Sequence, residues 1–277
     1  MNILINGMPA NIILESEKTI GEVLLGLEAW LNESAFRVSG LSVDGTVVTA
    51  GELETIFEQN VESVETLDIQ LSSWAVLALE ALMRSRSEIL QFLNSDSETQ
   101  ACIHKTWQRG SVFQFLAEQM PDIFAIVNQV LAGTTGESGA VLALIEERLQ
   151  ELTDPVAEFL QIKPQIDTAV KALENLPLDI QTGKDAQAAQ TIQLFSQIAE
   201  KLLRLLFILQ RQGLRLENSQ LDEFASLLQE LLQAYTVNDT VLVSDLAEYE
   251  IAPRLNQLYT TILNAISQEA STPPLTE

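Results

Sequence analysis

The chain has 277 residues, 47% of them hydrophobic, so it can form one large or two ordinary domains and is not disordered as a whole. Its 39 acidic and 15 basic residues leave a net charge of −24, which argues against binding to nucleic acid or to an anionic membrane over most of its surface. We expect protein partners with basic surfaces instead.

The apolar runs are shorter than the roughly 20 residues that a membrane-spanning helix needs, so no span is expected. Cys102 is the only cysteine and cannot form an intramolecular disulfide. The N-terminus has neither a cationic leader nor a small-residue cleavage site. The single cysteine and the N-terminus without a secretory pattern both favour a reducing, cytoplasmic setting.

Residues 1–72 have the pattern of a small mixed domain. Residues 6–9 form a turn, Asp44 and Gly45 form a second turn, and Thr19 with Glu22 forms a capping box at the start of a helix. We therefore expect strand, strand, helix, strand, strand, short helix and strand at residues 3–5, 11–14, 20–31, 36–43, 46–49, 52–59 and 64–71.

This order resembles the ubiquitin-like β-grasp superfamily. Within it, the opening Met1-Asn2-Ile3-Leu4-Ile5-Asn6-Gly7 and the helix start Lys18-Thr19-Ile20-Gly21-Glu22-Val23-Leu24 are most similar to the sulfur-carrier branch. Sulfur carriers end in Gly-Gly, whereas this strand ends in Asp68-Ile69-Gln70-Leu71-Ser72-Ser73 and continues into a helix, so carrier chemistry is not implied. The resemblance implies a compact module with 12 acidic and 2 basic residues, which either binds another protein or caps the helical part.

From Trp74 onward a helical periodicity replaces the strand pattern, except at residues 241–243, where a strand is an alternative. Pro121, Pro164 and Pro253 should kink or divide three of the helices, and residues 176–183 should form a connection that can act as a hinge. The helices are expected at residues 74–93, 96–110, 111–131, 138–152, 155–175, 184–213, 218–235 and 244–266.

The strongest apolar pattern lies in the helix before Gly213. Large apolar residues recur there in steps of three and four, and a second apolar row widens the face. With the next helix, capped by Asn218 or Ser219, it should form an antiparallel hairpin. The wide face fits either the core of a monomer or half of a homodimer interface. The candidate interaction surface consists of Phe195, Leu202, Leu206, Phe207 and Leu209.

These patterns together predict an α+β protein. A β-grasp-like domain at residues 1–72 precedes an all-α helical bundle at residues 73–269, and residues 270–277 form a frayed tail.

No residues form a convincing catalytic, cofactor or metal site. Cys102 and His104 are two positions apart, so their side chains diverge on a helix, and the chain offers no other Cys or His for a metal. Gly183-Lys184 lacks the upstream glycine and the following Ser or Thr of a phosphate loop, and Thr182 is interpreted as a helix cap.

Clusters of charged residues also have a structural interpretation that is simpler than a chemical site. Asp245 with Glu248 is more simply a helix cap and its box partner than a cation site completed by Glu250. Two cationic groups are expected to pair with carboxylates, within the chain or across a subunit interface. They are Arg84, Arg86, Lys105 and Arg109, and then Lys201, Arg204, Arg211 and Arg215.

We therefore expect a non-catalytic binding or assembly protein without a cofactor, which displays an acidic module on a helical scaffold and can form a homodimer. One alternative is an acidic cytoplasmic chaperone for a secreted or filament-forming partner. A second is an enzyme that uses carboxylates alone, although such sites are usually rich in aromatic residues and the chain has only 10 Phe, 3 Tyr and 3 Trp.

Overall fold

The chain separates into two compact units, Met1–Leu149 and Gln150–Glu277. The computed structural model describes the chain except residues 15, 32–35, 50, 217 and 272–277, so most of the expected tail at 270–277 lies outside the described residues. The domain boundary expected between residues 72 and 73 falls inside the first unit and stays a prediction.

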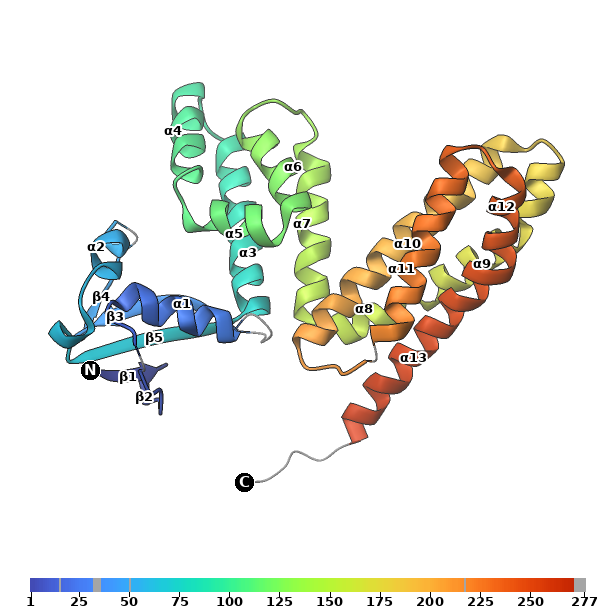
Figure 1. Cartoon of the computed structure of the whole chain (residues 1–277). Coiled ribbons are helices and arrows are strands. Elements are labelled where there is room, and N and C mark those ends of the chain that lie inside the picture. The colour runs from blue at the N-terminus through green and yellow to red at the C-terminus, as the bar shows by residue number, and fades with distance from the viewer. Residues whose placement is uncertain (15, 32–35, 50, 217, 272–277) are drawn as a thin grey trace. The chain divides into compact units, whose positions relative to one another are not determined.

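The first unit begins with a mixed five-stranded sheet (Figure 1). Its strands are β1 (Asn2–Ile5), β2 (Met8–Pro9), β3 (Phe36–Val43), β4 (Thr46–Val47) and β5 (Thr66–Ser73). They lie in the order β2-β1-β5-β3-β4, with β1 parallel to β5 and the other pairs antiparallel. The sheet is consistent with a β-grasp-like fold, and the predicted α+β class is confirmed.

Two tight turns join the antiparallel strand pairs β1–β2 and β3–β4. Asn6 and Gly7 have φ angles of 51° and 76°, and Asp44 and Gly45 have φ angles of 50° and 81°, as two-residue turns between antiparallel strands require. Because the first turn uses only two residues, the second strand is β2, and the strand expected at residues 11–14 is wrong. One more ladder bond follows β2, from the N–H of Ala10 to the carbonyl of Ile3 at 2.9 Å, and residues 11–14 have no regular secondary structure.

Helix α1 (Ile20–Leu31) packs its apolar face on the sheet, and α2 (Leu53–Phe57) lies between β4 and β5. The predicted capping box at the start of α1 is confirmed. The N–H of Glu22 donates to Thr19 Oγ1 at 3.3 Å, and Glu22 Oε2 accepts the N–H of Thr19 at 3.4 Å. The apolar side chains of the helix join those of the sheet in one core, which includes Ile20, Val23, Leu24, Leu27, Leu31, Leu41, Val43, Leu67 and Ile69.

Thr19→Ala is expected to lower the free energy of unfolding of the first unit by about 0.5–2 kcal/mol, because the N–H of Glu22 loses its cap. All three tryptophans, at positions 30, 74 and 107, belong to this unit, so urea titration followed by tryptophan fluorescence reports on it. Thr55→Ala, at an exposed position of α2, is the control and should change the value by less than about 0.5 kcal/mol. Equal effects of the two substitutions would contradict the cap.

Five helices complete the first unit, the last of which runs on into the second. They are α3 (Trp74–Leu93), α4 (Ser97–Trp107), α5 (Ser111–Gln119), α6 (Pro121–Leu131) and α7 (Ser138–Thr153). Asp96 caps α4 by accepting the N–H of Thr99 at 2.9 Å, close to the start expected for the helix at residues 96–110. Pro121 occupies the first position of α6, so the predicted division of this segment is confirmed.

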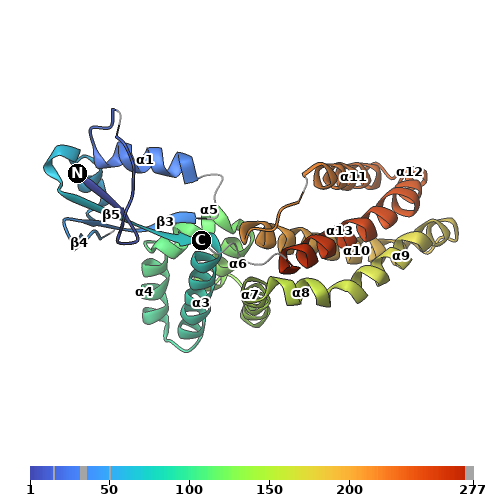
Figure 2. The same cartoon turned by 90° about the horizontal axis from the view of Figure 1, so that it is seen from below.

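Every regular element described in the second unit is helical. Its elements are α8 (Pro155–Gln161), α9 (Lys163–Gln181), α10 (Asp185–Arg211), α11 (Asn218–Thr236), α12 (Thr240–Asp245), a π-helical turn (Leu246–Ile251) and α13 (Ala252–Ser271). Figure 2 shows α9, α10 and α13 side by side, and the apolar side chains of these helices form most of the core of the unit.

The predicted pairing of α10 with α11 is wrong in detail. Helix α10 packs most closely on α9, whereas α11 packs on α12, the π-helical turn and α13. Only residues 182–184 join α9 to α10, and so short a connection makes these two helices antiparallel neighbours. Gly213 does end α10, with a φ of 114°. The side chains of Asn218 and Ser219, expected as caps of α11, lie outside those described.

Three further expectations fail in this unit. The hinge at residues 176–183 is absent, because α9 continues through Pro177 to Gln181 with Leu176 fully buried. Residues 241–243 are helical, and the last helical segment begins earlier than Ser244, since Asp239 caps α12 by accepting the N–H of Leu242 at 3.1 Å.

The irregularity expected at Pro253 is present as the π-helical turn that precedes it.

None of the helices within the described residues is both long and apolar enough to cross a membrane.

Candidate interaction site

The interaction surface predicted on α10 is mostly buried. Phe195, Leu202, Leu206 and Leu209 belong to the core of the second unit, and among the five candidates only Phe207 is exposed, at 42%. The guanidinium of Arg211 lies 5.1 Å from the centroid of the Phe207 ring. This placement favours a core role for α10, and the homodimer interface stays a prediction.

A more accessible apolar surface lies in the first unit. A groove of about 550 Å³ runs between α1 and the segment of residues 10–14, which has no regular secondary structure. Its lining residues come from β1, β5, the 10–14 segment and α1, together with Glu17 just before α1. They are Ile5, Ala10, Asn11, Ile12, Ile13, Leu14, Glu17, Val23, Gly26, Leu27, Trp30 and Ile69. We call this the α1 groove.

Local sequence explains why the α1 groove is open. The last bond between β1 and the chain after β2 runs from the N–H of Ala10 to the carbonyl of Ile3 at 2.9 Å, and the chain then leaves the sheet. On the opposite side, Gly26 has no side chain, and a Cβ built there meets no atom within 4 Å. The space beside α1 is therefore not filled by the described residues that surround it.

The α1 groove has a buried apolar floor and an exposed apolar rim. Ile69, Val23 and Leu27 are buried beneath it, whereas Ile13 is 80% and Trp30 is 72% exposed. Large apolar side chains exposed together are typical of a binding surface, because their contact with water is unfavourable.

The electrostatic setting of the α1 groove is acidic. Glu17 is the charged residue among those described that line it, and the 72 residues of the sheet region contain 12 acidic and 2 basic residues. Such a balance attracts cationic partners and repels anionic ones.

The sequence motifs do not converge on a chemical site. Cys102 is exposed, and His104 Nε2 lies 3.3 Å from Nε2 of Gln108. Lys184 Nζ forms an ion pair with Asp179 Oδ1 at 3.2 Å. In the part of the chain that the structure describes, no three His, Cys, Asp or Glu side chains are grouped so that they could hold a metal ion.

The residues around Tyr249 also differ from the prediction. Asp245 is the last residue of α12, and its side chain makes no capping hydrogen bond to the π-helical turn that follows, so the predicted cap is wrong. Tyr249 is exposed, and the negative charge of Glu248 raises the pKa of its hydroxyl, helped by a hydrogen bond to Glu248 and by the charge of Asp245.

Four cations of the two predicted groups pair with carboxylates, which confirms that expectation for them. One such contact is a buried network in the second unit, where Arg204 donates to Glu151 through Nε at 2.8 Å and Nη2 at 3.0 Å. The other ion pairs of these cations include Arg84–Glu88 at 3.3 Å, Arg86–Glu146 at 2.7 Å and Lys201–Glu158 at 3.3 Å.

Sequence reasoning missed the α1 groove. The sequence pattern places Ile12 and Ile13 in a strand at residues 11–14. The available signal was the run of three apolar residues at positions 12–14 so soon after a turn and a proline. A half-buried strand would alternate apolar and polar residues there.

Comparisons with known proteins match two separate parts of the chain. Residues 1–73 match the family model described as the TP0873 N-terminal domain, and residues 158–261 match a model described as a domain of unknown function, DUF8042. No solved structure matches. An uncharacterized protein of Treponema pallidum (strain Nichols) is 24% identical over 272 residues, which cover 95% of this chain and 97% of that protein. The chain is thus similar to that protein over almost the whole length of both.

Proposed function

We propose that this protein is a non-catalytic binding protein and that the α1 groove holds apolar side chains of a partner segment flanked by Lys or Arg. The observation that carries the proposal is an open apolar groove of about 550 Å³ within a strongly acidic region. Burial of Ile13 and Trp30 against a partner would supply the apolar contribution to binding. Lys or Arg residues beside the apolar segment would speed association with the acidic surface.

The strand order supports a further part of the proposal, that the sheet region is a ubiquitin-like β-grasp module. A parallel pairing of the first and last strands, with a helix across one face, is the arrangement expected from the sequence resemblance. Because β5 leads directly into α3, we do not extend the proposal to sulfur-carrier chemistry. The exposed thiol of Cys102 supports the expected reducing, cytoplasmic setting.

The test uses fluorescent peptides with a central Leu-Ile-Leu and Lys on both sides, titrated into the whole chain and followed by anisotropy. We expect binding that weakens with salt, and binding at least about tenfold weaker when the flanks are Glu or the centre is Ser-Gly-Ser. Gly26→Phe should abolish binding, because its ring enters the α1 groove where a Cβ meets no atom.

Two controls make the result specific. Gly26→Ala should retain binding and raise the free energy of unfolding by about 0.5–1 kcal/mol, because alanine loses less backbone entropy in a helix. Ala29→Phe adds the same ring at an exposed position of α1 outside the groove lining and should leave binding unchanged. Binding that survives Gly26→Phe, or that ignores the sequence of the peptide centre, would refute the proposal.

A further inference from the structure

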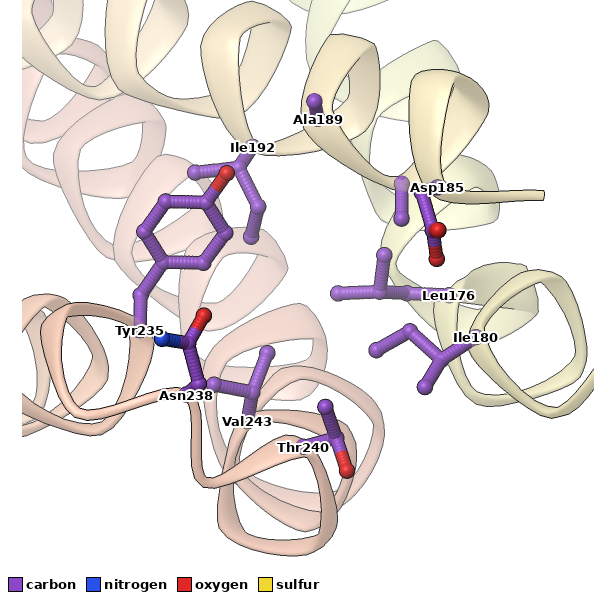
Figure 3. Close-up of a pocket in the computed structure, with 10 residues that line it drawn as sticks. Leu176, Ile180, Asp185, Ala189, Ile192, Tyr235, Asn238, Thr240 and Val243 are labelled. Carbon is purple, nitrogen blue, oxygen red and sulfur yellow. The ribbon is translucent and has the colours of Figure 1, made fainter. Parts of the chain in front are cut away.

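A separate cavity of about 190 Å³ lies at one end of the second unit, where α9 ends, α10 begins, α11 ends and α12 begins. Figure 3 shows that the ring of Tyr235 lies beside Ile192 on one side of this space and that Leu176 and Ile180 lie on the other. Val243 closes it from α12. Leu176, Ile192 and Val243 are buried, so the inner wall is fixed by the core of the unit.

Polar groups lie around the opening of this cavity. The carboxylate of Asp185 lies next to Leu176 and Ile180, and the amide of Asn238 lies near the ring of Tyr235 (Figure 3). Of the described lining residues, Asp185 is the one carboxylate and none is Lys or Arg. Asp185 lies in the first turn of α10 and is exposed, so its carboxylate is reachable from solvent.

Neighbouring charges make the opening negative. Lys184, the residue before Asp185, pairs with Asp179 at 3.2 Å. Asp239, which follows Asn238, uses its carboxylate to cap α12. This end of the unit thus carries the carboxylates of Asp179, Asp185 and Asp239 and the single ammonium group of Lys184, and this negative balance favours a cation over a neutral or anionic group.

We infer that this cavity binds an aliphatic cation, a primary ammonium or guanidinium group on a short alkyl stem. The stem lies against Leu176, Ile192 and Val243, and the charged head donates to Asp185. A space of 190 Å³ corresponds to roughly six waters at about 30 Å³ each, which matches the side chain of Lys or Arg or a small free amine. Apolar walls with one placed charge are the usual composition of such a site.

The two sources of this chemistry are separated by the choice of probes. Amide NMR spectra of the whole chain are titrated with n-butylammonium and n-butylguanidinium, and in a second arm with capped Gly-Lys-Gly and Gly-Arg-Gly peptides. We expect a Kd of about 1 mM for the small cations, with shifts centred on residues 185, 192, 238 and 243. Binding of the free cations alone identifies a small amine as the source, and binding of the peptides as well identifies a side chain of a partner.

Variants and a neutral probe decide the inference. n-Butanol and the Asp185→Asn protein with n-butylammonium should each show binding at least about tenfold weaker, because the charge-assisted hydrogen bond is lost. Ala189→Leu, which adds volume to the lining, should also remove binding. Glu174→Gln removes an exposed charge from α9 outside the lining and should change nothing.

Several results would overturn the inference. They are equal binding of n-butanol, unchanged binding by a folded Asp185→Asn protein, and no shifts at the cavity at any cation concentration. The cavity and the α1 groove belong to different units, so this inference and the proposed function are tested independently.

Discussion

Glu151→Ala should lower the free energy of unfolding of the second unit by about 3 kcal/mol, at the low end of the range for breaking a buried ion pair. The side chain of Glu151 is 0% exposed, and both of its oxygens accept hydrogen bonds from Arg204, at 2.8 and 3.0 Å. Removal of the carboxylate leaves the Arg204 guanidinium, only 19% exposed, without this bidentate contact. Water reaching the partly exposed guanidinium keeps the cost from being larger.

The control for this prediction is on the same arginine. Glu200 contacts Arg204 Nη1 at 3.2 Å, but its side chain is 70% exposed, so Glu200→Ala should cost less than about 1 kcal/mol. Urea titration followed by far-ultraviolet circular dichroism measures both, since the second unit contains no tryptophan. If Glu151→Ala and Glu200→Ala had the same effect, the buried pair would have no special structural importance.

The features that the sequence predicted well are those that local patterns decide. The capping box of Thr19 and Glu22, the helix start near residue 96 and the break at Pro121 each depend on residues within one helical turn, and all three are present. The burial of the α10 face was also predictable, because a repeat of period 3.6 sorts inward from outward positions regardless of the partner helix.

Helix partners were not predictable in the same way. The sequence shows that α10 is apolar on several sides, but α9 and α11 both offer apolar faces, and the choice between them depends on the tertiary arrangement. Pro177 illustrates the same limit. Its local effect favours a helix end, yet α9 continues past it because the buried side chains of Leu173 and Leu176 hold this part of the helix in the core.

The buried ion pair of Glu151 and the α1 groove were missed because each depends on residues that look ordinary alone. Glu151 lies in a segment with several other glutamates, where solvent exposure is the natural expectation, and only the packing of α10 buries it. The α1 groove exists because Gly26 and the short β2 leave a space beside α1, and the sequence alone does not show that this space is unfilled. Local patterns therefore predict which residues are apolar or charged, but not which of them are left without a packing partner.

Leu206→Asp should destabilise the second unit by more than about 4 kcal/mol, the largest effect that we expect from a single substitution in this chain. Leu206 is 2% exposed and belongs to the core that α10 forms with its neighbours. The substitution therefore buries a carboxylate among apolar side chains, where water does not solvate it. Loss of the leucine side chain adds a cavity term in the same direction. Loss of helical signal at low urea, measured by circular dichroism, checks this result.

The adjacent position separates core packing from self-association. Phe207 is 42% exposed, so Phe207→Asp should cost less than about 1 kcal/mol and leave the chain folded. If the exposed side of α10 is part of a homodimer interface, sedimentation velocity of Phe207→Asp should show a shift toward the monomer at a protein concentration where the unmodified chain is dimeric. Unchanged sedimentation with full helical signal would exclude Phe207 from any interface, and a folded Leu206→Asp protein would contradict the assignment of α10 to the core.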